Sequence, residues 1–375
     1  MPDLRAAEFF AGIGLVRAAL ERTGWQVVFA NDIEPFKYEM YRANFDASDF
    51  VLGDVRAVVG DDIPDIELAT ASFPCTDLSL AGARRGLDGE QSGMFWEFTR
   101  ILGEMGSRRP GAVLLENVPS FGTSKGGADL EAAIERLNEL GYACQVTICD
   151  ARRFVPQSRQ RMFIVGTIGG VPTVAGAQGA LPGFDRWPIH QPDWLRRFVD
   201  EHPTLRLSIF DVERPPASTK TLADVVERIP ARDKRWWDAE RLGRFVSSLS
   251  PRQAARFERM RTSKVTTWAT AYRRTRMSHA TWEIRPDKIS GCLRTSRGGS
   301  SRQVLVEAGR GEVRVRWMTA REYARLQGAP DFVIPDSVSG NQALSGFGDA
   351  VALPVVEWLS RHYLTPLVLG AREAA

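Results

Sequence analysis

The first 170 residues alternate between short apolar runs and stretches of helical period, and this alternation restricts the fold more than any other feature. The apolar runs have the length of buried strands; they are AAEFFAGIG (6–14), QVVFAND (26–32), IELATASF (66–73), GAVLLENV (111–118), ACQVTICD (143–150) and RMFIVGTI (161–168). Strands separated by helices of about 10 to 15 residues predict an α/β fold with a doubly wound, mostly parallel sheet. Ligands of such sheets bind beyond the carboxyl ends of the strands.

The pattern changes near residue 172, where Pro, Trp and Arg become frequent and no clear period is left. We therefore expect three parts: a ligand-binding domain over 1–171, a small irregular domain over 172–315, and a segment over 316–375 that returns to the first domain. The helical pattern of DAVALPVVEWLSRHYL is typical of a helix packing back on the sheet.

Basic residues are concentrated in one part of the chain. Residues 241–310 contain 16 Lys and Arg against 4 Asp and Glu, a local net charge of +12, whereas the remainder carries −9. A solvated surface usually mixes both signs, so this arginine-rich segment instead predicts contact with the phosphate backbone of a nucleic acid.

The four cysteines, Cys75, Cys144, Cys149 and Cys292, show no C-x-x-C spacing, and the chain has only four histidines. We therefore expect no zinc site, no other metal and no disulfide framework. The first residues lack the charge and apolar pattern of a signal peptide, and no apolar stretch reaches the roughly 18 residues of a membrane span. These features favour a cytoplasmic protein without membrane contact.

Glycines and acids follow the first predicted strands in an order typical of cofactor binding. FFAGIG (9–14) places glycines directly after a strand, where the backbone can turn tightly against a ligand. Asp32 and Glu34 end the next strand, about 20 residues later, where an acid commonly binds ribose hydroxyls. Asp54 follows the expected third strand. An adenosine-containing cofactor accounts for all three acids; solvated strand ends are the alternative.

Cys75 lies in SFPCTDLSLAG, directly after another predicted strand. A lone cysteine is most often a small buried hydrophobe. However, Glu116 ends the neighbouring predicted strand, and Arg159 and Arg161 alternate at the start of a further strand, so that both are expected on one side. A thiol, a carboxyl and paired guanidinium groups at one sheet edge favour a reactive site over core packing.

These blocks together resemble the DNA (cytosine-5) methyltransferases. FFAGIG, NDIEP, GDVR, FPCTDLSLAGARRGL, ENVPSF, QSRQRMF, RWMTAREYARLQGAPD and GFGDAVALPV occur in the order of that family and cover about 7–168 and 313–364. The resemblance implies a Rossmann-like class I methyltransferase fold with a target-recognition domain in the uncovered part. It also implies S-adenosylmethionine as the cofactor and C5 of cytosine in DNA as the methylated atom, reached by flipping the base.

The resemblance implies a role for each catalytic candidate. Cys75 would attack C6 of the cytosine, and Glu116 would hold the N3 and amine edge of the base. Arg159 would contact the O2 side, and Arg161 would support the carboxylate or the thiolate. Ser79 and Arg84 would lie in a loop that closes over the DNA.

On the cofactor side, the resemblance implies that Phe10, Gly12 and Gly14 form the glycine turn and that Asp32 binds the ribose. Ile33 would pack on the adenine, and the pair Asp54 and Val55 would read the adenine edge. Asp349 stands where the family commonly has Asn near the methionine end of the cofactor. Two more departures are Thr76, where Gln is common after Pro-Cys, and Cys292, where Thr is common; Thr295 would take over its role.

The arginine-rich segment holds the expected DNA contacts. They are Arg273, Arg274, Arg294, Arg297 and Arg302, together with Thr295. The tryptophans Trp236, Trp237, Trp268 and Trp282 are expected in the core of this domain. The partner would be double-stranded DNA, with a cognate restriction endonuclease or another defence-system component as a further partner, and we expect a nucleoid-associated monomer.

Two alternatives remain open from the sequence. The first is a tRNA cytosine-5 methyltransferase of the same fold; that group has almost no separate recognition domain, whereas about 140 residues separate the blocks here. The second is a catalytically inactive DNA-binding relative, which the presence of Cys75, Glu116 and Arg159 disfavours.

Overall fold

The computed structural model describes residues 4–74, 87, 93–169, 173–174, 192–208, 215, 217–276, 279–294 and 302–374. The chain forms two compact units. The first contains Met1–Asp150, Gln160–Pro215 and Val355–Ala375, and the second contains Ala151–Arg159 and Pro216–Pro354. The chain therefore enters the second unit twice, and the boundaries differ from the expected 172 and 316.

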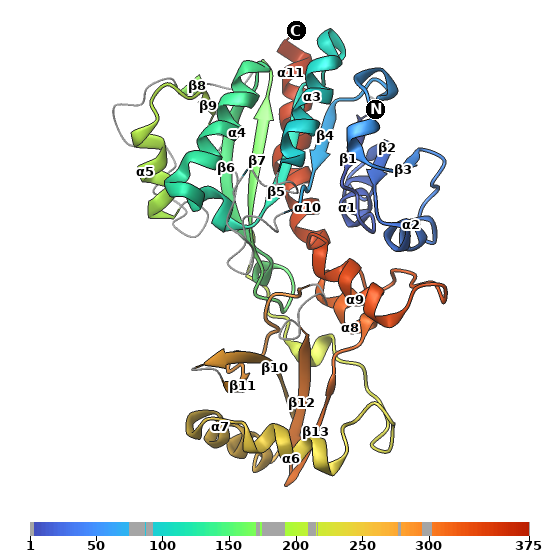
Figure 1. The fold of residues 1–375 in the computed structure, drawn as a ribbon, viewed down its shortest axis with the longest axis vertical. Coiled ribbons are helices and arrows are strands. Elements are labelled where there is room, and N and C mark those ends of the chain that lie inside the picture. The colour runs from blue at the N-terminus through green and yellow to red at the C-terminus, as the bar shows by residue number, and fades with distance from the viewer. Residues whose placement is uncertain are drawn as a thin grey trace. The chain divides into compact units, whose positions relative to one another are not determined.

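The first unit is built on a sheet of nine strands in the part that the structure describes, and Figure 1 shows their arrangement. They are β1 (Leu4–Phe9), β2 (Trp25–Asp32), β3 (Phe50–Leu52), β4 (Leu68–Ala71), β5 (Ala112–Asn117), β6 (Ala143–Asp150), β7 (Gln160–Thr167), β8 (Thr173–Val174) and β9 (Leu207–Ser208), in the order β3-β2-β1-β4-β5-β7-β6-β9-β8. Strands β1 to β5 run parallel, whereas β7 is antiparallel to both β5 and β6. The predicted doubly wound, mostly parallel sheet is confirmed.

Helices cover both faces of this sheet. They are α1 (Leu15–Glu21), α2 (Pro35–Arg42), α3 (Met94–Glu104), α4 (Ala128–Glu139), α5 (Asp193–Glu201), α10 (Leu353–Leu359) and α11 (Thr365–Ala374), with the shorter turns η1 (Val55–Ala57), η2 (Gly60–Asp62), η4 (Gly106–Arg108), η5 (Pro119–Gly127) and η9 (Ser360–Leu364). Figure 1 shows α3 and α4 on one face and α11 on the other. Among the helices described, none is long and apolar enough to cross a membrane.

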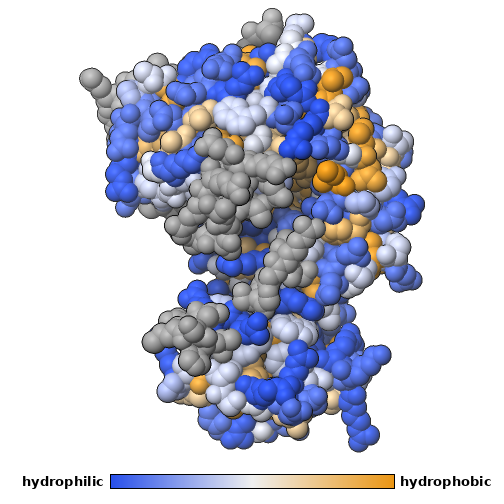
Figure 2. Space-filling model, in the orientation of Figure 1, coloured by the Kyte–Doolittle hydropathy of each residue, from blue (hydrophilic) through white to orange (hydrophobic). Residues whose placement is uncertain are grey.

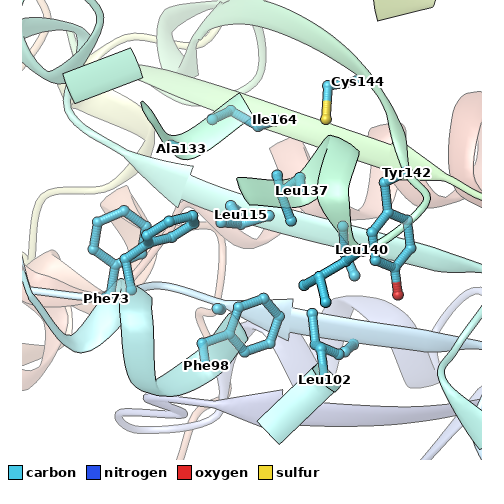
Figure 3. Close-up of a cluster of buried hydrophobic side chains, with 14 of the residues drawn as sticks. Phe73, Phe98, Leu102, Leu115, Ala133, Leu137, Leu140, Tyr142, Cys144 and Ile164 are labelled. Atoms are coloured by element: carbon cyan, nitrogen blue, oxygen red, sulfur yellow. The ribbon is translucent and has the colours of Figure 1, made fainter. Parts of the chain in front are cut away.

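The main core lies between the sheet and the pair α3 and α4. Leu115 and Ile164 of the sheet, Leu137 of α4 and Phe98 of α3 are all buried in this cluster, which Figure 3 shows. Cys144 belongs to it as well; it is fully buried, and desolvation raises the pKa of its thiol to about 12. This cysteine is therefore a packing residue with no thiolate at neutral pH.

The C-terminal segment is hydrogen-bonded to residues at the start of β2 in the same unit. The Oγ atoms of Thr23 and Ser360 lie 2.7 Å apart, and Trp25 Nε1 donates to Thr365 Oγ1 at 2.9 Å. These contacts hold Val355–Ala375 in the first unit, whereas residues 316–354 of the expected returning segment belong to the second unit.

The second unit contains a four-stranded antiparallel sheet, in the order β11-β10-β12-β13, and is more regular than the sequence suggests. Its strands are β10 (Thr267–Arg276), β11 (His279–Ile284), β12 (Gln303–Gly309) and β13 (Glu312–Trp317), and its helices and turns are η6 (Ala151–Arg153), η8 (Leu222–Asp224), α6 (Ala239–Ser247), α7 (Pro251–Arg261), α8 (Ala320–Leu326) and α9 (Gly340–Asp349). Phe245 of α6 and Phe257 of α7 pack on one face of the sheet together with Trp237 and Trp282, as expected for core tryptophans.

Backbone pairing and one ion pair explain where the units divide. The amide of Cys144 in β6 donates to the carbonyl of Arg206 at 3.0 Å, which holds residues 192–208 in the first unit. Arg316 of β13 and Glu322 of α8 form a fully buried ion pair at 2.5 Å, which holds the start of α8 in the second unit. Neither contact is visible in the periodicity of the sequence.

Candidate active site

A turn with left-handed backbone follows β1. Phe10, Gly12 and Gly14 have φ values of 56°, 59° and 83°. A Cβ at Gly14 would lie 2.6 Å from the Phe45 ring and 2.8 Å from the Tyr41 ring. Both the backbone conformation and the packing therefore require glycine at position 14.

Asp32, at the end of β2, holds this turn in place. One carboxylate oxygen accepts the amide of Gly12 at 2.8 Å, and the other accepts the amide of Glu34 at 2.9 Å. The Asp32 side chain is 6% exposed. A carboxylate has about four acceptor positions, of which the two amides take two. Lys37 Nζ lies 4.0 Å from the oxygen that accepts the Gly12 amide.

An apolar surface lies beside this acid. Ile33 is 60% exposed, and Val51 and Leu52 of the adjacent strand β3 are exposed as well; Figure 2 shows apolar atoms on the side of the molecule built from β1 to β3. Asp54 accepts the amide of Arg56 at 2.9 Å, whereas Val55 is buried in the core and presents only its backbone. An acid beside an exposed aliphatic surface fits an adenosine group.

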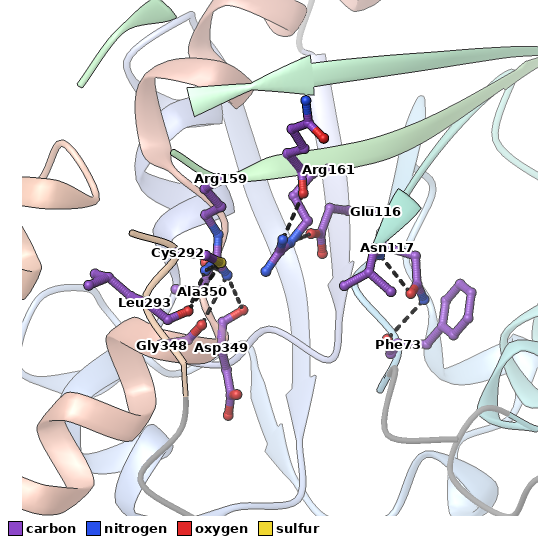
Figure 4. A network of polar contacts seen from close by, with 12 residues as sticks. Phe73, Glu116, Asn117, Arg159, Arg161, Cys292, Leu293, Gly348, Asp349 and Ala350 are labelled. Carbon is purple, nitrogen blue, oxygen red and sulfur yellow. Dashed lines mark hydrogen bonds and ion pairs between the residues drawn. The ribbon is translucent and has the colours of Figure 1, made fainter. Parts of the chain in front are cut away.

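The edge formed by β5 and β7 carries an ion pair. Glu116 is the next-to-last residue of β5, and its Oε1 lies 2.8 Å from Nε of Arg161 at the start of β7. Both side chains are mostly buried, with 11% and 15% exposed, and Figure 4 shows them pointing toward one another. The carboxylate is thereby held in one orientation while its second oxygen can accept a hydrogen bond.

Asn117 connects this edge to the segment that precedes Cys75. Its Nδ2 donates to the carbonyl of Phe73 at 3.4 Å, and its Oδ1 accepts the amide of Val118 at 2.8 Å (Figure 4). Strands β4 and β5 are parallel neighbours, so their carboxyl ends lie at the same edge of the sheet. One of these ends leads into Pro74, and the other carries Glu116. Cys75, Thr76, Ser79 and Arg84 lie outside the described residues. The sequence assigned no role to Asn117, although it stands in the ENV block.

Arg159 directly precedes β7 and is assigned to the second unit. It is 1% exposed, and its terminal nitrogens donate to the carbonyls of Leu293, Gly348 and Ala350 at 2.9, 3.0 and 2.7 Å (Figure 4). Strand β7 begins at Gln160, so the expectation that Arg159 and Arg161 alternate along one strand differs from the structure. The guanidinium of Arg159 joins two loops of its own unit.

Two buried glutamines complete this arrangement, and the sequence prediction missed both. Gln157 donates to the carbonyl of Leu326 at 2.9 Å and accepts the amide of Leu293 at 3.2 Å. Gln327 donates to the carbonyls of Phe347 and Ala350 at 2.5 and 2.9 Å. The only sequence signal for Gln157 is its place in the Gln-x-Arg-x-Arg block.

The remaining candidates of the second unit lie on its loops and strand ends. Asp349 has an exposed side chain at the end of α9, while Cys292 has its Sγ 3.4 Å from Arg159 Nη1. Thr295 and Arg297 lie outside the described residues. Among those that are described, no three or more His, Cys, Asp and Glu side chains are grouped to hold a metal.

Of the arginines expected to contact DNA, one lies near an acidic side chain and others are exposed. Arg273 and Arg274 are exposed near the end of β10, and Arg274 lies 3.9 Å from Glu283. Arg294 is exposed, and Arg302 lies over the Trp317 ring with its guanidinium carbon 4.8 Å from the centroid. Arg241 stacks on the same ring at 5.4 Å. Two cations therefore gather around one tryptophan.

The fold is shared with solved structures of methyltransferases. S. pombe Dnmt2 methyltransferase superposes with a TM-score of 0.61 at 18% identity, covering 97% of this chain and 99% of that one. The Entamoeba histolytica methyltransferase EhMeth superposes with a TM-score of 0.62 at 14% identity, covering 98% and 99%.

Sequence relatives narrow this class to one family. Residues 4–364 match the model of the C-5 cytosine-specific DNA methylases. The type II methyltransferase M.Bsp6I of Bacillus sp. (strain RFL6) is 25% identical over 96% of this chain and 98% of its own length, and M.HhaI of Haemophilus parahaemolyticus is 32% identical over 44% of this chain and 49% of its own. The chain belongs to the C-5 cytosine-specific DNA methylase family and is an S-adenosylmethionine-dependent DNA cytosine-5-methyltransferase.

Proposed function

We propose that this enzyme methylates C5 of a cytosine flipped out of a specific duplex DNA sequence, and that Cys75 forms a transient bond to C6. The observation that carries the proposal is the Glu116–Arg161 ion pair at the sheet edge where Phe73 and Pro74 lead into Cys75. The pair would present a fixed carboxylate to the N3 and amine edge of the base.

The reaction needs C5, a poor nucleophile, to become electron-rich. The Cys75 thiolate would add to C6 of a cytosine whose N3 has taken a proton from solvent, with the Glu116 carboxylate accepting N3–H. The electrons of the C5–C6 double bond would then move into a C4–C5 double bond, and those of the C4–N3 bond would stay on N3, which makes C5 electron-rich. S-Adenosylmethionine, when bound, supplies an electrophilic methyl group on a sulfonium centre. C5 would take this methyl group, and the cofactor would leave as S-adenosylhomocysteine. A base from solvent would then remove the C5 proton as the C6–S bond breaks and Cys75 leaves as its thiolate.

The contact to O2 of the base is reassigned from Arg159 to Arg161. The two terminal nitrogens of Arg159 are bound to carbonyls of its own unit. Arg161 already contacts Glu116, and its terminal nitrogens lie on the same planar group as the paired Nε. One guanidinium would therefore orient both the carboxylate and the base.

The cofactor would occupy the surface formed by Gly12, Asp32 and Ile33, with Asp54 and the Val55 backbone at the adenine edge. The exposed arginines of the second unit, with Ser79, Arg84, Thr295 and Arg297, would contact DNA. The relatives named as type II methyltransferases support a place in restriction-modification, with a cognate endonuclease or other defence component as partner. We further propose that the protein acts as a cytoplasmic monomer.

Bisulfite sequencing of DNA from cells that express the protein tests the substrate, with total tRNA from the same cells as the comparison. We expect 5-methylcytosine at one DNA sequence and none in tRNA. Purified protein, cofactor and DNA carrying 5-fluorocytosine at that sequence should form a denaturant-resistant complex, because fluorine replaces the proton that must leave. Cys75→Ala should bind this DNA but form no complex; a complex with that variant would overturn the covalent step.

A further inference from the structure

A tryptophan outside all the family blocks is packed against the active-site edge of the first unit. Trp194 lies at the start of α5, in a segment that the sequence analysis placed in the small domain over 172–315 and that belongs to the first unit. A Cβ built at Gly122 would lie only 2.2 Å from its Cη2 and 2.6 Å from its Cζ3. The edge of the indole therefore occupies the space that any larger residue at position 122 would fill.

Position 122 requires glycine because the indole of Trp194 leaves no room for a Cβ, and not because of its backbone conformation. It is buried and is absent from the glycines with positive φ, so an alanine could adopt its conformation. The Sδ of Met162 lies 3.2 Å from the same Cβ position. Met162 directly follows Arg161, so the ring and the strand that carries Arg161 converge on one point of η5.

The turn η5 is joined to strand β5, which carries Glu116. It follows β5 directly, and the amide of Phe121 donates to the carbonyl of Val118 at 3.0 Å. Phe121 is fully buried and meets Phe73 edge to face, with the ring centroids 5.8 Å apart. Displacement of η5 would therefore move Phe73, which leads into Cys75, and the end of β5, which carries Glu116.

Helix α5 is anchored without Trp194. Leu195 and Phe198 are buried in the main core, and His202 lies 3.4 Å from Glu131 of α4. Loss of the indole should thus leave the helix docked while releasing η5. We propose that Trp194 is a positioning residue for the Glu116–Arg161 ion pair.

The first test measures how well the Glu116–Arg161 ion pair protects the Arg161 Nε–H from exchange with solvent. It uses the free protein and needs no substrate. The Nε–H signal of Arg161 is assigned by its loss in Arg161→Lys, and its exchange with solvent is followed by NMR. Because an aromatic contact of this kind is worth about threefold to tenfold in an equilibrium, Trp194→Ala should accelerate this exchange by that factor. Trp194→Phe should restore most of the protection. Unchanged exchange in Trp194→Ala would overturn the inference.

The second test rests on the proposed function and uses single-turnover methylation of DNA. Trp194→Ala should lower the rate constant by about tenfold to a hundredfold, with dissociation constants for DNA and cofactor nearly unchanged, because small misplacements of reacting groups are costly. Val199→Ala, on the same helix and partly buried against the main core, is the matched control. An equal fall in the rate constant of this control would overturn the inference, because docking of α5 and not the indole would then set the rate of methylation. Absence of methylation in the wild type would overturn the proposed function, while the exchange measurement still decides the role of Trp194.

A double-mutant cycle tests the contact itself. Gly122→Ala should displace the indole and accelerate Arg161 exchange, whereas the same change in a Trp194→Leu background should cost less, because the smaller side chain leaves room. Additive effects of the two substitutions would contradict direct coupling between these positions.

Discussion

The Nε of Arg161 lies 2.8 Å from Oε1 of Glu116, across two antiparallel strands of one sheet. The two residues come from blocks 45 positions apart in the chain, and the sheet brings them together because β7 lies beside β5. A charge-assisted hydrogen bond between mostly buried groups fixes the direction of the carboxylate before any substrate arrives.

Replacement of Arg161 by lysine should therefore reduce catalysis without reducing DNA affinity. An ammonium group cannot donate from Nε to the carboxylate and to a base in one plane. We expect the single-turnover rate of methyl transfer to fall by about 100-fold. Arg136→Lys, in an exposed pair with Glu139 on α4, is the control and should keep the wild-type rate. A wild-type rate for Arg161→Lys would contradict the role assigned to this residue.

Arg159 should instead be important for the stability of the second unit. In Arg159→Leu the carbonyls of Leu293, Gly348 and Ala350 lose a buried donor. At about 1–3 kcal/mol for each unsatisfied buried group, the free energy of unfolding should fall by about 3 kcal/mol or more. Urea unfolding measures the change. Arg244→Leu, on an exposed position of α6, should change it little.

Arg302, which lies over the Trp317 ring, should contact a DNA phosphate. Arg302→Ala should weaken DNA binding and reduce the slope of log K against log salt by about 1, which is the effect of one lost phosphate contact. Arg314→Ala is the matched control, because Arg314 is already paired with Glu307 and Glu312. Fluorescence anisotropy at several salt concentrations gives both slopes. Equal slopes for wild type and Arg302→Ala would place this residue away from DNA.

The buried Glu8 of β1 should make stability depend on pH. Desolvation raises the pKa of its carboxyl to about 8, although Arg17 nearby lowers it, and Asp32 and Glu21 act in the raising direction. The unfolded chain ionises Glu8 near its ordinary value of 4.5, so unfolding releases a proton between about pH 4.5 and 8. Stability contributed by the neutral carboxyl is therefore present at low pH and lost as pH rises through this window.

Glu8→Gln removes this dependence, because the amide has no charge to lose. The melting temperature of the variant should exceed that of the wild type by a margin that grows from pH 5 toward pH 8, the window set by the two pKa values. Thermal unfolding at several pH values measures the difference. A margin that shrinks as pH rises would contradict a raised pKa for Glu8.

The sequence predicted the elements of the first unit because their periodicity is a local property. The runs that become β1, β2, β4 and β5 are apolar, and α4 repeats apolar residues every three to four positions. The position of Glu116 at a strand end followed from the same pattern. The sequence did not predict that β7 runs antiparallel to β5 and β6, because an apolar run has the same composition in either direction.

Contacts between distant positions were beyond a sequence argument. Arg159 reaches carbonyls 134 to 191 positions away, and nothing in its neighbours distinguishes such a donor from one that meets a substrate. Gln157 was missed for the same reason. The first unit continues past residue 172 because β9 pairs with β6 through a short strand, Leu207–Ser208, that has no period of its own.

The fastening of residues 355–374 onto Thr23 and Trp25 has a consequence for synthesis. The ribosome makes the first two strands long before it makes the helix that covers them, and the whole second unit is translated in between. One face of the sheet thus stays exposed to chaperones and proteases until the last residues emerge. A premature stop before Val355 leaves Trp25 without Thr365, so quality control can remove a truncated enzyme before it modifies any DNA.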